Sequence, residues 1–225
     1  MNDKLVFWIG VLGVIFFGVA SFLGGFLIDN YNPISQYISE SMAVDTPYGK
    51  ELRLLGYVPS GILLTIFSFT GHKKFPKSNL TKIGFLGLGV FYGIATIVVG
   101  LFPCDKGCDK EMIDPSISQV IHSLTGLLTY MFVPISIIII GFGLRQSEKF
   151  KKLSEIAFFC GLICIAFIGL LLSDPKTIYA GLFQRIVEAT FIVWIIACSI
   201  FIKKGYETKQ NNRLKKIENQ QITRE

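Results

Sequence analysis

Apolar residues lie in six long blocks along this chain, and short polar segments separate the blocks. Each block is roughly 20 residues or longer with almost no charge, the length that an α-helix needs to cross a hydrocarbon layer of about 30 Å. The predicted membrane-spanning helices are residues 5–28, 51–71, 83–103, 117–144, 154–173 and 178–202. We therefore expect an all-α integral membrane bundle of six transmembrane helices, with residues 1–203 as its domain and residues 204–225 as a basic cytoplasmic tail.

A shorter pattern follows the first block. Beyond Pro33, apolar and polar residues alternate at helical spacing. The apolar members are Ile34, Tyr37, Ile38 and Met42. This pattern predicts a short amphipathic helix that lies on the outer surface and caps the bundle.

Four outer connections carry a proline directly after a residue that can cap a helix. These pairs are Asn32-Pro33, Thr46-Pro47, Asp114-Pro115 and Asp174-Pro175. A capping side chain before a proline is typical of a helix start, so we expect helices to begin at these pairs. Counted from Pro115 and Pro175 at 1.5 Å per residue, His122 and Arg185 lie at about 10 and 15 Å, which places both in the outer half of the bundle.

Strongly polar side chains interrupt the last block. Gly181, Gln184, Arg185 and Glu188 recur at the spacing of one helical face. A charge at the centre of a spanning helix costs roughly 2.5 to 3.5 kcal/mol on insertion scales, so such a face seldom meets lipid. We expect this face to look into the bundle, and an ionisable pair at membrane depth indicates a functional site.

The fourth block has a matching stripe of polar and small residues. Its members are Gln119, His122, Ser123, Gly126 and Tyr130. We predict that the two faces line one cavity beneath the outer segment. The predicted ligand-binding residues are His122, Ser123, Gln184, Arg185, Glu188, Asn32 and Ser35. Arg185 is the expected anchor for an anionic group, because its planar guanidinium can pair with phosphate or carboxylate through two hydrogen bonds. The alternative is a structural network in which Arg185 and Glu188 partly neutralise each other and hydrogen-bond to neighbouring helices.

Composition and charge support the membrane assignment. Charged residues make up 17% of the chain, against about 25% in soluble domains, and apolar residues make up 51%. The net charge of +6 does not indicate nucleic-acid binding, because its distribution follows the spans. With the N-terminus inside, the inner segments hold 16 of the 22 Lys and Arg residues and the outer segments hold five. This bias predicts a plasma-membrane protein with both termini in the cytoplasm.

The cysteines fall into two groups. Cys104 and Cys108 lie in an outer loop, where thiols meet an oxidising environment, and predict a local disulfide. The alternative for this loop is a cation site of Asp105, Asp109 and Asp114, although their spacing matches no calcium-binding loop. The other three cysteines are expected to be buried apolar residues.

Histidine usage bears on metal chemistry. The chain has two histidines, His72 and His122, and the predicted topology places them on opposite sides of the membrane. A catalytic zinc usually needs three protein ligands. We therefore expect no metal site, no haem held by two histidines and no other cofactor.

Four short motifs follow one another along the spans. They are Asn32-Pro33-Ile34-Ser35, Leu101-Phe102-Pro103-Cys104-Asp105, Ile121-His122-Ser123 and Gly181-Leu182-Phe183-Gln184-Arg185. In this order they resemble a family of prokaryotic six-span membrane proteins catalogued as domain of unknown function 998. The resemblance covers nearly the whole chain and implies no activity. The Pro-Ile-Ser turn and the histidine also resemble the eukaryotic Frag1, DRAM and Sfk1 group, which implies a link to membrane lipid organisation. Gln36 stands where that wider pattern has an acidic residue.

These patterns predict a polytopic membrane protein whose outward-facing polar cavity binds a small ligand or a lipid headgroup. The expected partners are membrane lipid and this ligand, and the oligomeric state stays open. One alternative is a membrane-embedded enzyme acting on lipid, with Ser123 or Ser35 as the hydroxyl beside His122. The other is a structural or partner-binding membrane protein without a ligand.

Overall fold

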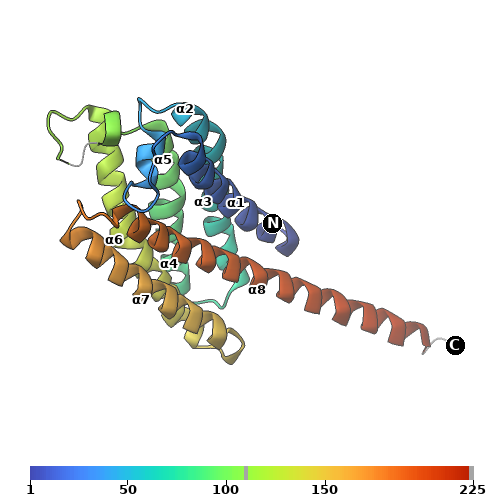
Figure 1. Cartoon of the computed structure of the whole chain (residues 1–225). Helices are drawn as coiled ribbons and strands as arrows, with labels where there is room; N and C mark the ends of the chain where they lie inside the picture. Colours follow the sequence, from blue (N-terminus) through green and yellow to red (C-terminus); the bar gives the residue numbers. More distant parts are fainter. Residues whose placement is uncertain (109–110, 223–225) are drawn as a thin grey trace.

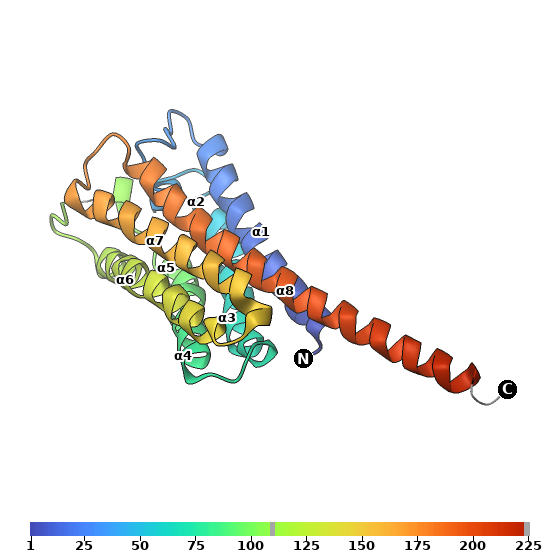
Figure 2. The ribbon, with the colours of Figure 1, turned by 90° about the horizontal axis from the view of Figure 1, so that it is seen from below.

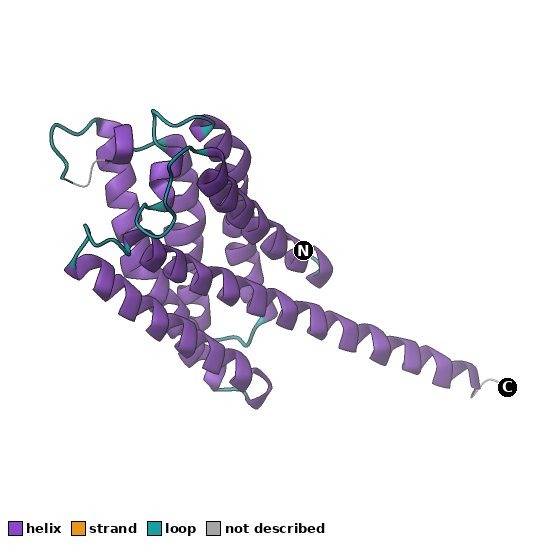
Figure 3. Cartoon of the chain, viewed as in Figure 1, coloured by secondary structure: helices purple, strands orange, loops and turns teal. Residues whose placement is uncertain are grey.

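Helices form all the regular secondary structure in the computed structural model, which describes residues 1–108 and 111–222, and no strand occurs within these ranges (Figures 1 and 3). Six helices in the described part of the chain are long and apolar enough to cross a membrane. They cover Asp3–Leu27, Gly49–Lys74, Asn79–Leu101, Ile117–Arg145, Glu148–Ser173 and Ala180–Gly205. The predicted six-helix membrane bundle is confirmed.

Two of the spans are interrupted by π-helical turns. The uninterrupted helices are α1 (Asp3–Leu27), α6 (Ile117–Arg145), α7 (Lys151–Ser173) and α8 (Ala180–Ile222). The second span consists of α2 (Gly49–Glu51), the π turn η2 (Leu52–Tyr57) and α3 (Val58–Gly71). The third span consists of α4 (Asn79–Leu88), the π turn η4 (Gly89–Ile94) and α5 (Ala95–Leu101). Short 3₁₀ helices in the connections are η1 (Ile38–Met42), η3 (His72–Lys74), η5 (Lys106–Cys108) and η6 (Glu148–Phe150).

The helix α8 runs beside α1 and α7 and then continues beyond the other helices toward the C-terminus (Figures 1 and 2). The helix α6 packs against α4 and α7. We call the end of the bundle with the connections at residues 28–48, 102–116 and 174–179 the disulfide end. The opposite end carries the N-terminus and the connections at residues 72–78 and 146–150. The predicted tail begins inside α8, which continues as helix to Ile222.

Large apolar side chains fill the middle of the bundle. Phe67, Phe85, Ile137 and Trp194 are all fully buried. Their packing depends on close approach between helices, and a Cβ atom on Gly84 of α4 would overlap the backbone of α6. Such contacts matter because van der Waals packing is a main attraction between helices in lipid.

The two π turns place tyrosines in the bundle interior. In η2 the N–H of Val58 donates to the carbonyl of Arg53, five residues earlier. Pro59 follows directly and has no backbone N–H, which interrupts the regular ladder of α-helical bonds here. Tyr57 ends η2 and Tyr92 lies in η4, and both side chains are buried.

The outer segment is less helical than its pattern predicts. Its helix, η1, is a five-residue 3₁₀ helix, and Ile34 before it is 50% exposed. The preceding residues form a turn in which the side chain of Asn32 accepts the N–H of Ile34 at 2.9 Å. The N–H of Gln36 also donates to the Asn32 carbonyl at 2.8 Å. Local side-chain bonds of this kind compete with helix formation, which explains the difference.

None of the four predicted helix starts is correct. The chain forms a turn after Pro33, and α2 begins at Gly49 after the left-handed residue Tyr48. Asp114 has a φ of 48°, in the left-handed region, and does not cap α6. Ser116 does so, because its hydroxyl accepts the N–H of Gln119 at 3.1 Å. After Pro175 the chain forms a turn, and α8 begins only at Ala180.

Candidate functional site

A cavity of about 530 Å³ lies between the helices in the half of the bundle nearest the disulfide end. The elements η1, η2, η4, α6, α7 and α8 all contribute to its wall. Four of the predicted ligand-binding residues line it, namely His122, Ser123, Gln184 and Glu188. The structure therefore brings the polar stripe of α6 and part of the polar face of α8 together.

Glu188 is the acidic residue of this cavity. Its side chain is 8% exposed, and its two carboxylate oxygens accept hydrogen bonds from Tyr92 at 3.3 Å and Tyr130 at 3.2 Å. Tyr57 also lines the cavity, and its hydroxyl is buried. No lysine or arginine lines the cavity in the described part of the chain. The deep wall of the cavity is thus a carboxyl group among phenol rings.

Sequence reasoning did not identify Tyr57 and Tyr92 as site residues. Each lies inside an apolar block, where a tyrosine is an unremarkable interior side chain. The signal that could have found them is a phenol group deep in a spanning helix, because a buried Tyr hydroxyl usually needs a partner. Which partner it meets depends on how the helices pack.

The polar groups nearest the disulfide end are hydrogen-bonded to the loop that covers them. The side-chain oxygen of Gln184 accepts the N–H of Ile38 at 2.6 Å and thereby ties η1 to α8. The ring nitrogen Nδ1 of His122 lies 2.9 Å from the carbonyl oxygen of Phe102. A carbonyl only accepts, so Nδ1 carries the proton in this contact. Ser123 accepts a hydrogen bond from the side chain of Gln119 at 3.0 Å.

Arg185 does not lie in this cavity. Its Nη1 donates to the carbonyl oxygens of Pro33 (2.7 Å), Gln36 (2.9 Å) and Gly181 (3.1 Å), and its Nη2 donates to the hydroxyl of Tyr31 (2.7 Å). The guanidinium also lies over the Tyr31 ring, 5.6 Å from its centroid. Arg185 holds the turn after α1 against the start of α8.

No ion pair joins Arg185 and Glu188 in the described residues, although each hydrogen-bonds to neighbouring segments, as the alternative of a structural network predicts. Arg185 and Glu188 both line a second cavity, of about 370 Å³. Positions three apart on a helix differ by about 60° in direction. That difference is enough to separate the two side chains here.

Asn32 and Ser35 lie in the turn that Arg185 holds, and neither lines a cavity described here. The N–H of Ser35 donates to the carbonyl of Asn32 at 3.2 Å. Burial raises the pKa of the neighbouring Tyr31, although Arg185 acts in the opposite direction. Tyr31 remains neutral and donates its hydroxyl to the carbonyl of Tyr37 at 2.6 Å. These residues shape the loop rather than the cavity.

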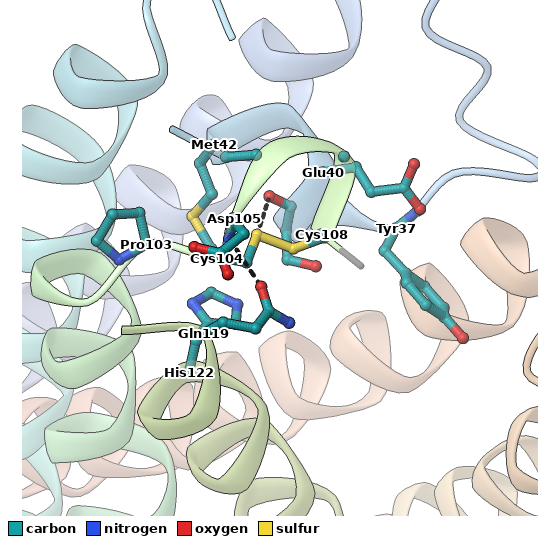
Figure 4. Close-up of a disulfide and its surroundings, with 12 residues drawn as sticks. Tyr37, Glu40, Met42, Pro103, Cys104, Asp105, Cys108, Gln119 and His122 are labelled. Carbon is teal, nitrogen blue, oxygen red and sulfur yellow. Dashed lines mark hydrogen bonds between the residues drawn. A yellow bond between two sulfur atoms is a disulfide. The ribbon is translucent and has the colours of Figure 1, made fainter. Parts of the chain in front are cut away.

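Cys104 and Cys108 form the predicted disulfide with their Cα atoms 5.0 Å apart, within the range of about 4.4 to 6.8 Å that is usual for disulfides (Figure 4). Figure 4 shows His122 and Gln119 directly beside it, and the N–H of Asp105 donates to the Gln119 side chain at 2.7 Å. The two sulfur atoms and a His122 nitrogen lie within 4.8 Å of one another. As a disulfide, the sulfurs are not thiolate ligands.

The alternative cation site in this loop includes Asp109, which lies outside the described residues. The carboxylate of Asp105 accepts hydrogen bonds from the N–H and hydroxyl of Ser116. The cysteines Cys160, Cys164 and Cys198 are free and fully or almost fully buried. They pack in the apolar core, as the sequence predicts.

Comparison with known proteins bears on the family. The profile of a family described as "Protein of unknown function (DUF998)" matches residues 11–200. No curated protein and no solved structure matches the chain. The likeness to the Frag1, DRAM and Sfk1 group is not shown by these comparisons. Because the family profile covers most of the chain, and six spans lie in the described residues, the protein belongs to this family of polytopic membrane proteins of unknown function.

Proposed function

We propose that this protein binds an amphiphilic molecule taken from the membrane, with the polar end of that molecule in the 530 Å³ cavity. The observation that carries the proposal is a mouth on the lipid-facing side. Leu127 and Met131 of α6 and Leu172 of α7 line the cavity and are also 45%, 48% and 59% exposed. Residues that are both lining and exposed mark where a cavity opens, and Met112 and Pro175 in the adjacent connections share this property.

The geometry of α6 and α7 explains this opening. Near the opposite end of the bundle they touch closely, since a Cβ atom on Gly141 would contact Ala157 and one on Gly161 would press on Ile138. Nearer the disulfide end, a Cβ atom on Gly126, which lines the cavity, would meet nothing within 4 Å. The helices therefore separate toward the disulfide end. In a bilayer, acyl chains lie against that gap.

The interior suits a molecule with one polar and one apolar end. Its volume lies within the range of about 300 to 1,000 Å³ that is typical of small-molecule sites. Apolar residues of α6 and α7 form the mouth, whereas Tyr57, Tyr92 and Glu188 lie on the deep wall. An acyl chain at the mouth and a polar group at the deep wall would each meet matching surface.

The test is native mass spectrometry of the full chain from mild detergent, with a variant that blocks the mouth. Gly126→Trp should fill the gap with a ring and abolish the co-purifying amphiphile. Gly169→Trp is the matched control, because that position is equally open but does not line the cavity. Equal amounts of the same bound molecule in both variants would rule out this route of entry.

A further inference from the structure

We infer that the polar end of the bound amphiphile is a cation, either an amine or a quaternary ammonium group, held by Glu188 within a cage of aromatic rings. The inference rests on the proposed function, since it names the class of ligand for the same cavity. Three features of the described residues support it. They are the charge of the cavity, the aromatic wall and the placement of the nearest cations.

The charge of the cavity is the first feature. The carboxyl group of Glu188 receives hydrogen bonds from two neutral phenols, one on each oxygen. A carboxylate has about four acceptor sites, so these two bonds leave acceptor capacity for a ligand. A buried carboxylate at membrane depth is costly unless a cation or further donors compensate it. A ligand ammonium group would supply both charge and donors.

The placement of the protein's own cations is the second feature. Arg185, three residues away, is held by the carbonyl oxygens of Pro33, Gln36 and Gly181 and does not line this cavity. His122 lines it, but eight residues from Tyr130 along α6, or about 12 Å. Among the described lining residues, no lysine or arginine is present to receive an anionic headgroup.

The aromatic wall is the third feature. The ring of Phe17 lies 5.3 Å from the ring of Tyr57 and 6.1 Å from that of Tyr92, measured between centroids. All three residues line the cavity, as does Tyr130. Aromatic faces within about 6 Å attract cations, and cages of this type bind quaternary ammonium groups. The buried hydroxyl of Tyr57 adds a polar group to this wall.

Anionic and uncharged headgroups fit the lining of this cavity less well than a cation does. An anionic headgroup would bring a second negative charge beside Glu188, and repulsion between like charges opposes this. An uncharged hydroxyl could donate to the carboxylate but would make no use of the aromatic faces. The cation satisfies the carboxylate and the rings together.

The experiment compares four probes that share one acyl chain length. They are dodecylamine, dodecyltrimethylammonium, dodecanol and dodecanoate. Each is titrated into the full-length protein in a nonionic detergent, and thermal unfolding is followed by the fluorescence of tryptophan, with bound probe counted by native mass spectrometry. A ligand that binds the folded protein raises its Tm in a saturable way. We expect saturable stabilisation by the two cationic probes.

The variants separate charge from shape. Glu188→Gln keeps the size of the side chain and its capacity for hydrogen bonds. It should lower the affinity for the two cationic probes at least about tenfold and leave the affinity for dodecanol unchanged. Glu155→Gln removes an exposed carboxylate on α7 and is the control for non-specific attraction of cations. Phe17→Leu should lower the affinity for dodecyltrimethylammonium but not for dodecanol, because it removes one aromatic ring of the cage without changing the charge.

Each outcome decides between the two proposals. Equal affinity for dodecanol and dodecylamine, or tighter binding of dodecanoate, overturns the cationic inference and leaves the amphiphile site standing. Equal weakening of the cationic probes by Glu155→Gln and Glu188→Gln also overturns it. If none of the four probes binds saturably, and Gly126→Trp and Gly169→Trp co-purify with the same molecules, the proposed function fails as well.

Discussion

Two charged residues on one helix have opposite surroundings in this protein. Arg185 donates to backbone carbonyls of a turn that lies about 150 positions earlier in the chain, and Glu188 accepts from phenols of the third and fourth spans. Each charge is compensated by neutral hydrogen-bonding groups rather than by the other charge. This arrangement leaves Glu188 as the acidic residue of the cavity and gives Arg185 a structural role.

We predict that Arg185→Lys lowers the free energy of unfolding by about 2 kcal/mol, because an ammonium group cannot reproduce the planar array of bonds to the turn. Binding of an amphiphile in the cavity should persist, since Arg185 does not line it. Thermal unfolding in detergent measures the change. Lys176→Gln is the control, because Lys176 pairs with Glu111 on an exposed surface, where such pairs contribute at most about 1 kcal/mol. Equal losses in the two variants would contradict the structural role of Arg185.

A second residue-scale prediction concerns pH. Hydrogen bonds from the hydroxyl and N–H of Ser116 hold the pKa of Asp105 below its usual range. A carboxylate with a depressed pKa in the folded state contributes stability above its unfolded pKa, near about 3.9, and that contribution is lost as pH falls through the lower folded pKa. Asp105→Asn should therefore be less stable than the wild type at pH 6.

The difference between wild type and Asp105→Asn should shrink as the pH falls below about 4. Thermal unfolding midpoints measured from pH 6 down to 2.5 test this. A constant difference across the range would show that Asp105 acts through contacts that do not depend on its charge.

At the scale of elements, the start of α8 is built to receive the turn after α1. The N–H of Leu182 donates to the carbonyl of Ile34 at 2.8 Å, and a Cβ atom on Gly181 would overlap the carbonyl oxygens of Pro33 and Gln36. Only glycine leaves room for this backbone approach. The same contact positions η1, whose residues Ile38 and Met42 line the cavity.

We predict that Gly181→Ala is destabilising by about 1 to 3 kcal/mol, because the turn must move away from α8. Gly169→Ala in α7 is the matched control, since a Cβ there meets nothing within 4 Å and alanine favours helix over glycine by up to about 1 kcal/mol. Thermal unfolding of both variants in the same detergent checks the prediction. A Gly181→Ala protein as stable as Gly169→Ala would mean that the turn is not held against α8.

At the scale of the whole molecule, all six spans contribute to the lining of the cavity, and the proposed function has it open sideways between α6 and α7. Lipid-facing openings of this kind let a membrane molecule enter without crossing water. The orientation of the bundle decides on which side of the membrane the disulfide end lies. The excess of Lys and Arg in the segments at the opposite end favours placing that end in the cytoplasm.

We predict that single cysteines introduced at Asp45 or Lys176 react with a membrane-impermeant maleimide in intact cells, and that cysteines at Lys73 or Lys149 react only after lysis. The native cysteines interfere little, because they are either buried or joined as Cys104–Cys108. The reverse labelling pattern would place the disulfide end in the cytoplasm and exclude entry of the ligand from the outer leaflet.

The sequence by itself determined the number and position of the spans, because crossing a bilayer depends on the length and hydrophobicity of one continuous segment. The Cys104–Cys108 pairing was also predictable, since the partners lie four positions apart along the chain. The sequence also indicated that His122, Ser123, Gln184 and Glu188 face inward, because the face on which a residue lies depends only on its position along its own helix.

Tertiary structure decided what each inward side chain meets. Arg185 and Glu188 share a polar stripe in the sequence, yet about 60° of helical rotation sends one to a loop and the other to the cavity. The tyrosines of η2 and η4 became part of the site only because the packed helices bring three spans to one carboxyl group. Such contacts join residues far apart in the chain, and their partners depend on how the helices pack against one another.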